Sequence, residues 1–165
     1  MKKIYLLTLM AVFVAIGTLG AQFFWFPAGI AKAYPVQHAV NVMAAITLGP
    51  GPAVVIAFMI GLLRNMLGLG TILAFPGAVI GAWLAGMLYH WFGKKIWAIV
   101  GESFGTGIIG ALTAVPLANL FMDSSAGALF FIPSFLVSSV TGAFIGWLVL
   151  LRVKPENMIR LQGNY

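Results

Sequence analysis

The sequence predicts an all-α integral membrane protein in which six transmembrane helices pack as one bundle, a single domain over residues 1–165. Hydrophobic residues make up 62% of the chain, and the mean hydropathy of +1.06 is too high for a water-soluble surface. The nine Lys and Arg and the three Asp and Glu residues lie mostly between apolar stretches. A bilayer-spanning helix needs about 20 apolar residues. Stretches of this kind fill the chain: Ile4–Phe24, Tyr34–Leu48, Pro52–Leu67, Ile72–Phe92, Ile96–Leu120 and Gly127–Leu151.

The first stretch begins after Met-Lys-Lys, a start that is also typical of a secretory signal peptide. Leu19 stands two residues before Ala21, where a cleavage site needs a small residue, so we expect Ile4–Phe24 to be retained as a helix. The next segment, FFWFPAGIAK at 23–32, is more apolar than a linker needs to be. Two interpretations fit it equally: an aromatic belt at the membrane interface, or a lid over an outward-facing pocket.

The second stretch is short, and tight turns join the later ones. From Pro35 to Gly49 a helix would rise about 21 Å, less than the roughly 30 Å of hydrocarbon. It therefore either begins within the preceding loop or ends at partial depth. Gly and Pro in GPGP at 49–52 stop this helix and start the third. The other turns are GLGT at 68–71, HWFGKK at 90–95 and MDSS at 122–125.

Basic residues predict the orientation of the bundle. They gather before the first helix, between the fourth and fifth, and after the sixth: Lys2, Lys3, Lys94, Lys95, Arg152, Lys154 and Arg160. Six alternating helices place all of these on one side, whereas Lys32 and Arg64 lie towards the other. By the positive-inside rule, both termini are cytoplasmic and the chain is a multi-pass protein of the cell membrane.

Small residues recur at four-residue spacing, which lets helix backbones approach closely in lipid. The sets are Ala11 and Ala15; Gly77, Gly81 and Ala85; Gly101 and Gly105; and Gly142 and Gly146. We expect most of them to pack helices within one monomer. The first pair shares a face of the terminal helix with Thr8, so it could instead meet another membrane subunit.

Several types of chemistry are not expected. The chain has no cysteine, and its two histidines fall on opposite sides of the membrane in this topology, so we expect no metal site. No nucleotide-binding G-x-x-x-x-G-K-[ST] motif occurs, so uphill transport would take its energy from partner subunits or an ion gradient. The run GESFG at 101–105 matches the G-x-S-x-G of hydrolases, but that motif needs a strand-to-helix turn. We therefore expect no enzymatic activity, and no cofactor bound by this chain.

Two ionisable residues lie within the apolar stretches. Glu102 and Arg64 each cost roughly 2.5–3.5 kcal/mol to insert, so both are candidates for function. Measured along their helices, they are offset by about 9 Å. Three interpretations stay open: the two form a structural ion pair, one or both face a polar cavity and contact a ligand, or Arg64 snorkels to the interface.

Neutral polar and aromatic residues surround these two. His38 and Asn41 are three residues apart and share a face of the second helix. Apolar walls with a few placed polar groups are typical of a small-molecule pocket, here for a small, partly aromatic molecule. An interhelical hydrogen bond is the alternative for each polar residue alone. The predicted substrate-binding residues are His38, Asn41, Arg64, Asn65, Phe75, Glu102, Thr106, Trp25 and Phe26.

Three segments carry a resemblance to a known family. AYPVQHAVNV at 33–42, GLLRN at 61–65 through LAFPG at 73–77, and GESFGTG at 101–107 resemble the ThiW family. Its members are substrate-binding S components of energy-coupling-factor (ECF) vitamin transporters, associated with the thiazole precursor of thiamin. The matching positions of the polar candidates are His38, Asn41, Arg64, Asn65, Glu102 and Thr106.

The resemblance implies a six-helix S component that binds hydroxyethylthiazole, or a related thiamin moiety, from outside. It also implies a membrane T component and two ATPase subunits that hydrolyse ATP, with toppling of the S component to release substrate inward. Ala11 and Ala15 match the Ala-x-x-x-Ala pattern that meets the T component, and the loop Trp25–Lys32 would be the gate. Nucleic acid is not an expected partner.

The sequence therefore predicts a non-enzymatic subunit that binds a thiamin precursor for import. Two alternatives remain. In the first, the chain is a structural or assembly membrane protein whose polar residues bond helices together. In the second, it is a stand-alone proton- or sodium-coupled carrier in which Glu102 is the titrating group.

Overall fold

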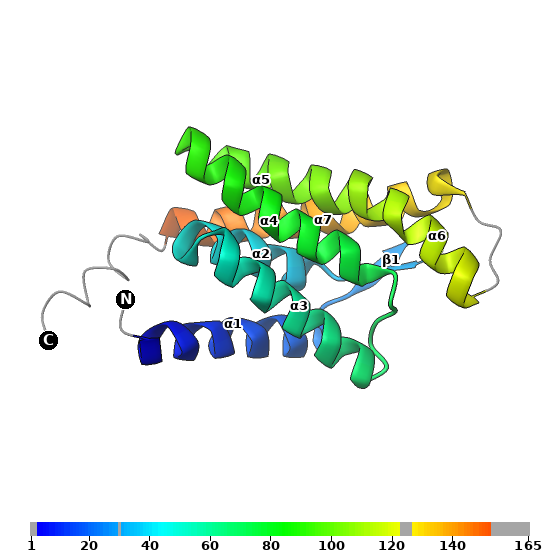
Figure 1. The fold of residues 1–165 in the computed structure, drawn as a ribbon, viewed down its shortest axis with the longest axis horizontal. Helices are drawn as coiled ribbons and strands as arrows, with labels where there is room; N and C mark the ends of the chain where they lie inside the picture. Colours follow the sequence, from blue (N-terminus) through cyan, green and yellow to red (C-terminus); the bar gives the residue numbers. More distant parts are fainter. Residues whose placement is uncertain (1–2, 30, 123–126, 153–165) are drawn as a thin grey trace, which may run out of the picture.

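The computed structural model describes residues 3–29, 31–122 and 127–152, and in this part of the chain six helical stretches form one elongated bundle (Figure 1). The beginning of α1 and the end of α7 lie at the same end of it. Five of the stretches are α-helices, and the sixth and longest joins α5, a π-helical segment η1 and α6 end to end. Their bounds are α1 Lys3–Phe23, α2 Pro35–Leu48, α3 Pro50–Met66, α4 Ala74–Phe92, α5 Lys95–Phe104, η1 Gly105–Gly110, α6 Ala111–Met122 and α7 Ala128–Arg152.

The all-α class is confirmed, and the helical stretches begin and end within a few residues of the predicted ones. Among the described residues, three helices are long and apolar enough to cross a membrane: Lys3–Phe23, Lys95–Met122 and Leu129–Arg152. α2 has 14 residues, too few to span the hydrocarbon core alone. Six complete spans and cytoplasmic termini therefore stay predictions.

Proline and glycine set the helix ends that the sequence analysis placed at turns. α2 begins at Pro35 and α3 at Pro50, because proline suits the first helical position, where its missing N–H is not needed. Only Gly49, with φ of 90°, separates the two helices. Gly93 ends α4 in the left-handed conformation, and its N–H bonds to the carbonyl of Tyr89.

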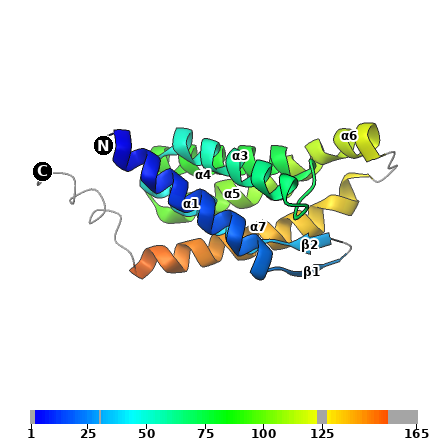
Figure 2. The ribbon, with the colours of Figure 1, turned by 90° about the horizontal axis from the view of Figure 1, so that it is seen from below.

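The aromatic segment before α2 is a small β-hairpin, which the sequence analysis did not predict. Strand β1 (Phe26–Ala28) pairs antiparallel with β2 (Ala31–Ala33). α2 therefore begins at Pro35 and does not extend into the preceding loop. Two serines of α7 hold the hairpin: Ser134 Oγ donates to the Ala28 carbonyl at 2.7 Å, and the Tyr34 N–H donates to Ser138 Oγ at 2.9 Å. Figure 2 shows the hairpin alongside α7.

Small residues allow the helices to pack closely against one another, as their four-residue spacing predicts. A Cβ at Gly142 would lie 2.2 Å from the Pro35 carbonyl oxygen, and one at Gly86 would lie 2.5 Å from the Pro50 Cα. Ala11 and Ala15 differ from these, because both stay exposed on α1. Most of the interior packing is therefore satisfied within the chain, while this one face of α1 has no helix of the described chain upon it.

Candidate binding pocket

A cavity of about 400 Å³ lies at the end of the bundle that carries the hairpin. It is bounded by β2, the first turns of α2, the end of α3, the loop 67–73, α4, η1 and α7. The volume falls within the range of pockets that hold small molecules. The lining residues are Ala31, Lys32, Tyr34, Gln37, His38, Arg64, Gly68, Leu69, Gly70, Thr71, Leu73, Ala74, Ala78, Thr106, Phe131, Ser134, Phe135 and Ser138.

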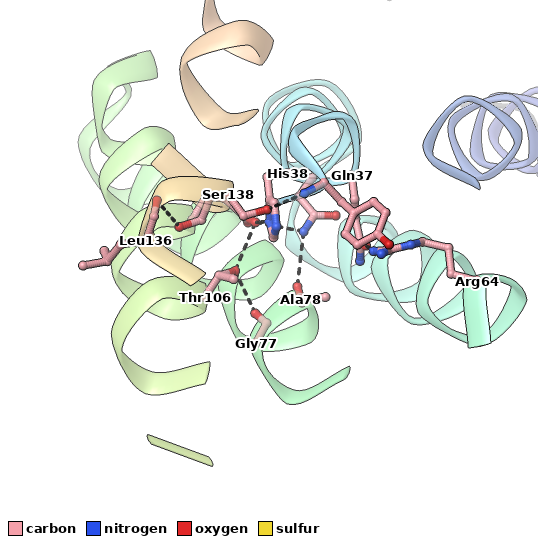
Figure 3. Close-up of polar contacts among 12 residues, drawn as sticks. Gln37, His38, Arg64, Gly77, Ala78, Thr106, Leu136 and Ser138 are labelled. Atoms are coloured by element: carbon pink, nitrogen blue, oxygen red, sulfur yellow. Dashed lines mark hydrogen bonds and ion pairs between the residues drawn. The ribbon is translucent and has the colours of Figure 1, made fainter. Parts of the chain in front are cut away.

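A buried network around Glu102 supports one wall of the cavity; its members His38 and Thr106 are labelled in Figure 3. Glu102 Oε1 lies 2.7 Å from His38 Nδ1 and accepts hydrogen bonds from Asn41 Nδ2 at 3.0 Å and Thr106 Oγ1 at 3.1 Å. His38 and Thr106 line the cavity, whereas Asn41 and Glu102 lie behind them with no exposed surface. Because Nδ1 of His38 is turned towards the carboxylate, Nε2 is the ring nitrogen left for the cavity.

Local backbone features make room for this network. Thr106 lies in η1, and π-helical segments are frequent at functional sites because they widen the helix. Its hydroxyl also lies 2.9 Å from the Gly77 carbonyl of α4. A Cβ at Gly81 would lie 2.2 Å from Thr106 Oγ1 and 2.9 Å from Glu102 Oε2. The glycines of α4 thus let η1 approach closely enough for these hydrogen bonds to form.

Arg64 forms a second polar group on the opposite wall. Its Nη1 donates to Gln37 Oε1, its Nη2 donates to the Leu69 carbonyl at 3.2 Å, and its guanidinium carbon lies 3.9 Å from the centre of the Tyr34 ring. The side chain is buried yet lines the cavity. Two interpretations from the sequence are therefore wrong: Arg64 does not pair with Glu102, and it does not snorkel away from the bundle.

Comparison with known protein families decides the kind of protein. The family described as "Thiamine-precursor transporter protein (ThiW)" matches residues 7–156. The chain belongs to the ThiW family. The resemblance found in the sequence is thereby confirmed, and with its apolar helices this chain is a membrane protein of a family that transports a thiamine precursor, a small molecule. Neither the curated proteins nor the solved structures contain a match.

In this ThiW-family chain, five of the nine predicted site residues belong to the cavity or the network behind it: His38, Arg64 and Thr106 line the cavity, and Asn41 and Glu102 support His38. All five come from blocks that carried the family resemblance. They are brought together from α2, α3, α5 and η1, and the contact between His38 and Glu102 joins residues 64 apart in the sequence.

The other four predicted residues do not line the cavity. Asn65 Nδ2 donates to the Gly61 carbonyl of its own helix at 3.1 Å, because one residue beyond Arg64 the helix has turned by about 100°. Phe75 packs edge-on against Phe58, with ring centres 5.6 Å apart. Trp25 is 46% exposed, with Lys32 Nζ 4.0 Å from its ring centre, and Phe26 is half-buried in β1.

α7 supplies lining residues that the sequence analysis did not single out. Phe131, Ser134, Phe135 and Ser138 follow the spacing i, i+3, i+4, i+7, so they share one helix face. Serine and phenylalanine alternating on one face of an apolar helix is a signal that could have found them. Tyr34 and Gln37 lie within the 33–42 block and complete the aromatic and polar lining.

Proposed function

We propose that this chain is the substrate-binding S component of an ECF-type importer and that the cavity captures a thiamin precursor, hydroxyethylthiazole first among them. One observation carries the proposal. Buried polar side chains from α2, α3, η1 and α7 meet at one cavity, whereas a structural protein would bond them pairwise with no space between.

The chemistry of the lining suits a small heteroaromatic alcohol. Tyr34, Phe131 and Phe135 provide aromatic walls on which a ring can stack. His38 Nε2 and the serine hydroxyls of α7 can exchange hydrogen bonds with a ring nitrogen and a hydroxyl group. The ligand would thus be oriented by a few polar contacts inside mostly apolar walls, as in other small-molecule sites.

The hairpin is the proposed gate. Its residues Ala31 and Lys32 line the cavity. Serine hydrogen bonds at Ala28 and at Tyr34, the residue directly after β2, attach it to α7 and can break without disturbing a helix. The cavity lies at the opposite end of the bundle from the beginnings of α1 and α5, which start at Lys3 and Lys95. If the positive-inside rule holds for this chain, the gate faces the outside.

The exposed face of α1 is the proposed contact for the T component. Ala11 and Ala15 are exposed together with Thr8, whereas Gly17 and Gly20 of the same helix face inward, against Ile60 and Val36. A flat surface of small residues allows a second membrane helix to approach closely. Energy would come from ATP hydrolysis by the partner ATPases.

Ligand binding by the purified full chain tests the proposal. Calorimetry with hydroxyethylthiazole, hydroxymethylpyrimidine and thiamin should detect binding of the thiazole alcohol, and His38→Phe should weaken it about tenfold or more because its nitrogens are lost. His90→Phe, at an exposed histidine at the other end of α4, is the matched control. Binding of none of the three compounds would overturn the proposal. A lower melting temperature with intact binding would instead support a structural role for His38.

Uptake into proteoliposomes tests the partners. Ala11→Leu combined with Ala15→Leu should abolish uptake with the T component and ATPases while ligand binding persists. Ile16→Leu, at an exposed residue turned by about 100° from Ala15 and further from Ala11, should preserve both. Uptake that persists without the ATPases and collapses with an uncoupler would favour the ion-coupled carrier and contradict the proposal.

A further inference from the structure

We propose that this pocket selects its ligand by charge, accepting the neutral thiazole and rejecting the thiazolium cation of finished thiamin. The inference rests on the proposed function and deepens it. It states how the site would tell a precursor from the vitamin, although both contain the same five-membered ring.

Size alone does not make this distinction. A cavity of about 400 Å³ lies within the range that holds drug-sized molecules, so it has space for more than a single substituted ring. The ring also carries the same methyl and hydroxyethyl groups in both compounds. The difference at the ring is the nitrogen, which bears a lone pair in the free thiazole and a permanent positive charge in thiamin.

Two cationic side chains line the cavity. Arg64 is 4% exposed, and Gln37, the Leu69 carbonyl and the Tyr34 ring hold its guanidinium group in place. Lys32, in β2, adds a second positive charge at the rim. A guanidinium group stays protonated under all ordinary conditions, so a cationic ligand would always meet at least one fixed like charge inside a largely apolar site.

No compensating carboxylate reaches the cavity from residues 3–29, 31–122 or 127–152. Glu102 is the only acidic residue in these ranges, it is fully buried, and it does not line the cavity. Its Oε1 already accepts hydrogen bonds from Asn41 and Thr106 and contacts His38, whose ring stands between the carboxylate and the cavity. Its Oε2 is buried against Gly81 of α4 and has no hydrogen-bond partner among the described residues. Neither oxygen of the one negative charge in reach therefore lines the cavity.

The aromatic walls are the remaining attraction for a cation, through cation–π contacts. One face of Tyr34 is already taken by Arg64, whose positive charge opposes a cation on the other face. Phe131 and Phe135 remain, packed edge-on with ring centres 6.2 Å apart, and phenylalanine is a weaker partner for cations than tryptophan. Repulsion from Arg64 and Lys32 should therefore outweigh this attraction, because like charges at close range interact strongly away from bulk water.

The experiment compares hydroxyethylthiazole with its N-methyl thiazolium salt, which differs by one methyl group and one positive charge. Calorimetry uses the full chain in nanodiscs of zwitterionic lipid, so that the membrane itself does not attract the cation. The expected dissociation constant of the cation is at least about tenfold higher than that of the neutral compound.

Charge variants then separate repulsion from the bulk of the extra methyl group. Lys32→Glu and Arg64→Gln should each lower the ratio of the two dissociation constants by about threefold or more. Lys32→Glu is the safer variant, because Lys32 is exposed and contacts the exposed Trp25 ring, whereas Arg64 is part of the wall. Lys94→Gln, an exposed charge change at the far end of the bundle, should leave the ratio unaltered.

The outcomes distinguish charge selection from exclusion by size and from failure of the proposed function. Equal binding of both compounds would overturn charge selection while the proposed function stands. A ratio that stays the same in Lys32→Glu and Arg64→Gln would also overturn it, because the methyl group would then be excluded by size. If neither compound binds, the proposed function itself fails and charge selection fails with it.

Discussion

The two ends of the bundle are built differently, and α2 takes part in both. The pocket half contains the hairpin, the first turns of α2 and the cavity. The packed half contains residues 42–60, which include the α2–α3 turn, and residues 82–98, which include the α4–α5 turn. In the packed half, side chains such as Ala45, Ala53, Ala57, Ala82 and Ala85 are fully or almost fully buried. Van der Waals contact between small residues holds that half together.

The pocket half instead depends on directed hydrogen bonds. Three polar residues come from the first two turns of α2. Gln37 accepts from Arg64 of α3, whereas His38 and Asn41 both contact Glu102 of α5. Buried polar groups are costly unless satisfied, so this half is stable only when its partners keep their positions. The comparison teaches that substitutions in the packed half should act on stability first, and those in the pocket half on binding first.

The largest expected effect is a loss of stability from Gly86→Val in the packed half. A Cβ there would lie 2.5 Å from the Pro50 Cα, so the side chain forces α3 and α4 apart. Overpacking of this kind costs about 3 kcal/mol. Thermal unfolding of the purified chain should show a large drop in melting temperature. In Gly51→Val no atom lies within 4 Å of the added Cβ, so the change should stay within about 0.5 kcal/mol; equal effects would contradict the packing difference.

Glu102→Gln should weaken both ligand binding and the stability of the chain, because His38, Asn41 and Thr106 of the pocket half all contact Glu102 Oε1. The amide cannot accept as strongly from the donors that meet at Oε1, and an N–H group placed there would face other donors. Leaving a buried donor unsatisfied costs about 1–3 kcal/mol, and the loss of a fixed His38 should raise the dissociation constant about tenfold.

The neighbouring residue gives the control for Glu102→Gln. Ser103 Oγ is buried and has no hydrogen-bond partner among the described residues. Ser103→Ala should therefore be neutral or slightly stabilising in the same calorimetric and thermal measurements. If Glu102→Gln behaves like Ser103→Ala, the network does not position His38.

A smaller effect is expected from Ser134→Ala combined with Ser138→Ala, which removes both hydrogen bonds between α7 and the hairpin segment. Each bond contributes about 0.5–1.5 kcal/mol, and both serines also line the cavity. Stopped-flow measurements should therefore show ligand release several times faster, with little change in melting temperature. Ser139→Ala is matched to these, because Ser139 Oγ donates to the Leu136 carbonyl of its own helix. Release as slow as in the unmodified chain would show that the hairpin does not control access.

The smallest effect is expected from Asn65→Ala. Asn65 follows Arg64 directly, but its amide bonds to the Gly61 carbonyl and does not line the cavity. Calorimetry should show a dissociation constant within about twofold of the original. A tenfold loss would place Asn65 at the ligand after all and would extend the pocket half along α3.

Much of the fold could be predicted from local sequence. Long apolar runs give helices in any membrane setting, because backbone groups must bond within the segment where no water is present. Proline and glycine mark their ends at Pro35, Gly49 and Gly93. The family resemblance depended on the same local blocks, and the family match over residues 7–156 confirms it.

The hairpin and η1 were harder to predict. β1 and β2 are three residues each, and an aromatic run with a proline is equally typical of an interfacial belt. η1 depends on the fit of Thr106 between Glu102 and the Gly77 carbonyl. Neither leaves a periodic pattern, because both are stabilised by contacts with α7 or α4.

The sequence by itself determined that this chain is a membrane bundle, where its helices begin and end, and which few buried polar residues need partners. Only the tertiary structure decided who those partners are: Glu102 meets His38 rather than Arg64, Asn65 turns back to its own helix, and α7 completes the pocket. The physical reason is that a helix's local pattern sets its apolar and polar faces, whereas the rotation and depth at which two helices meet depend on close packing between small residues far apart in the chain.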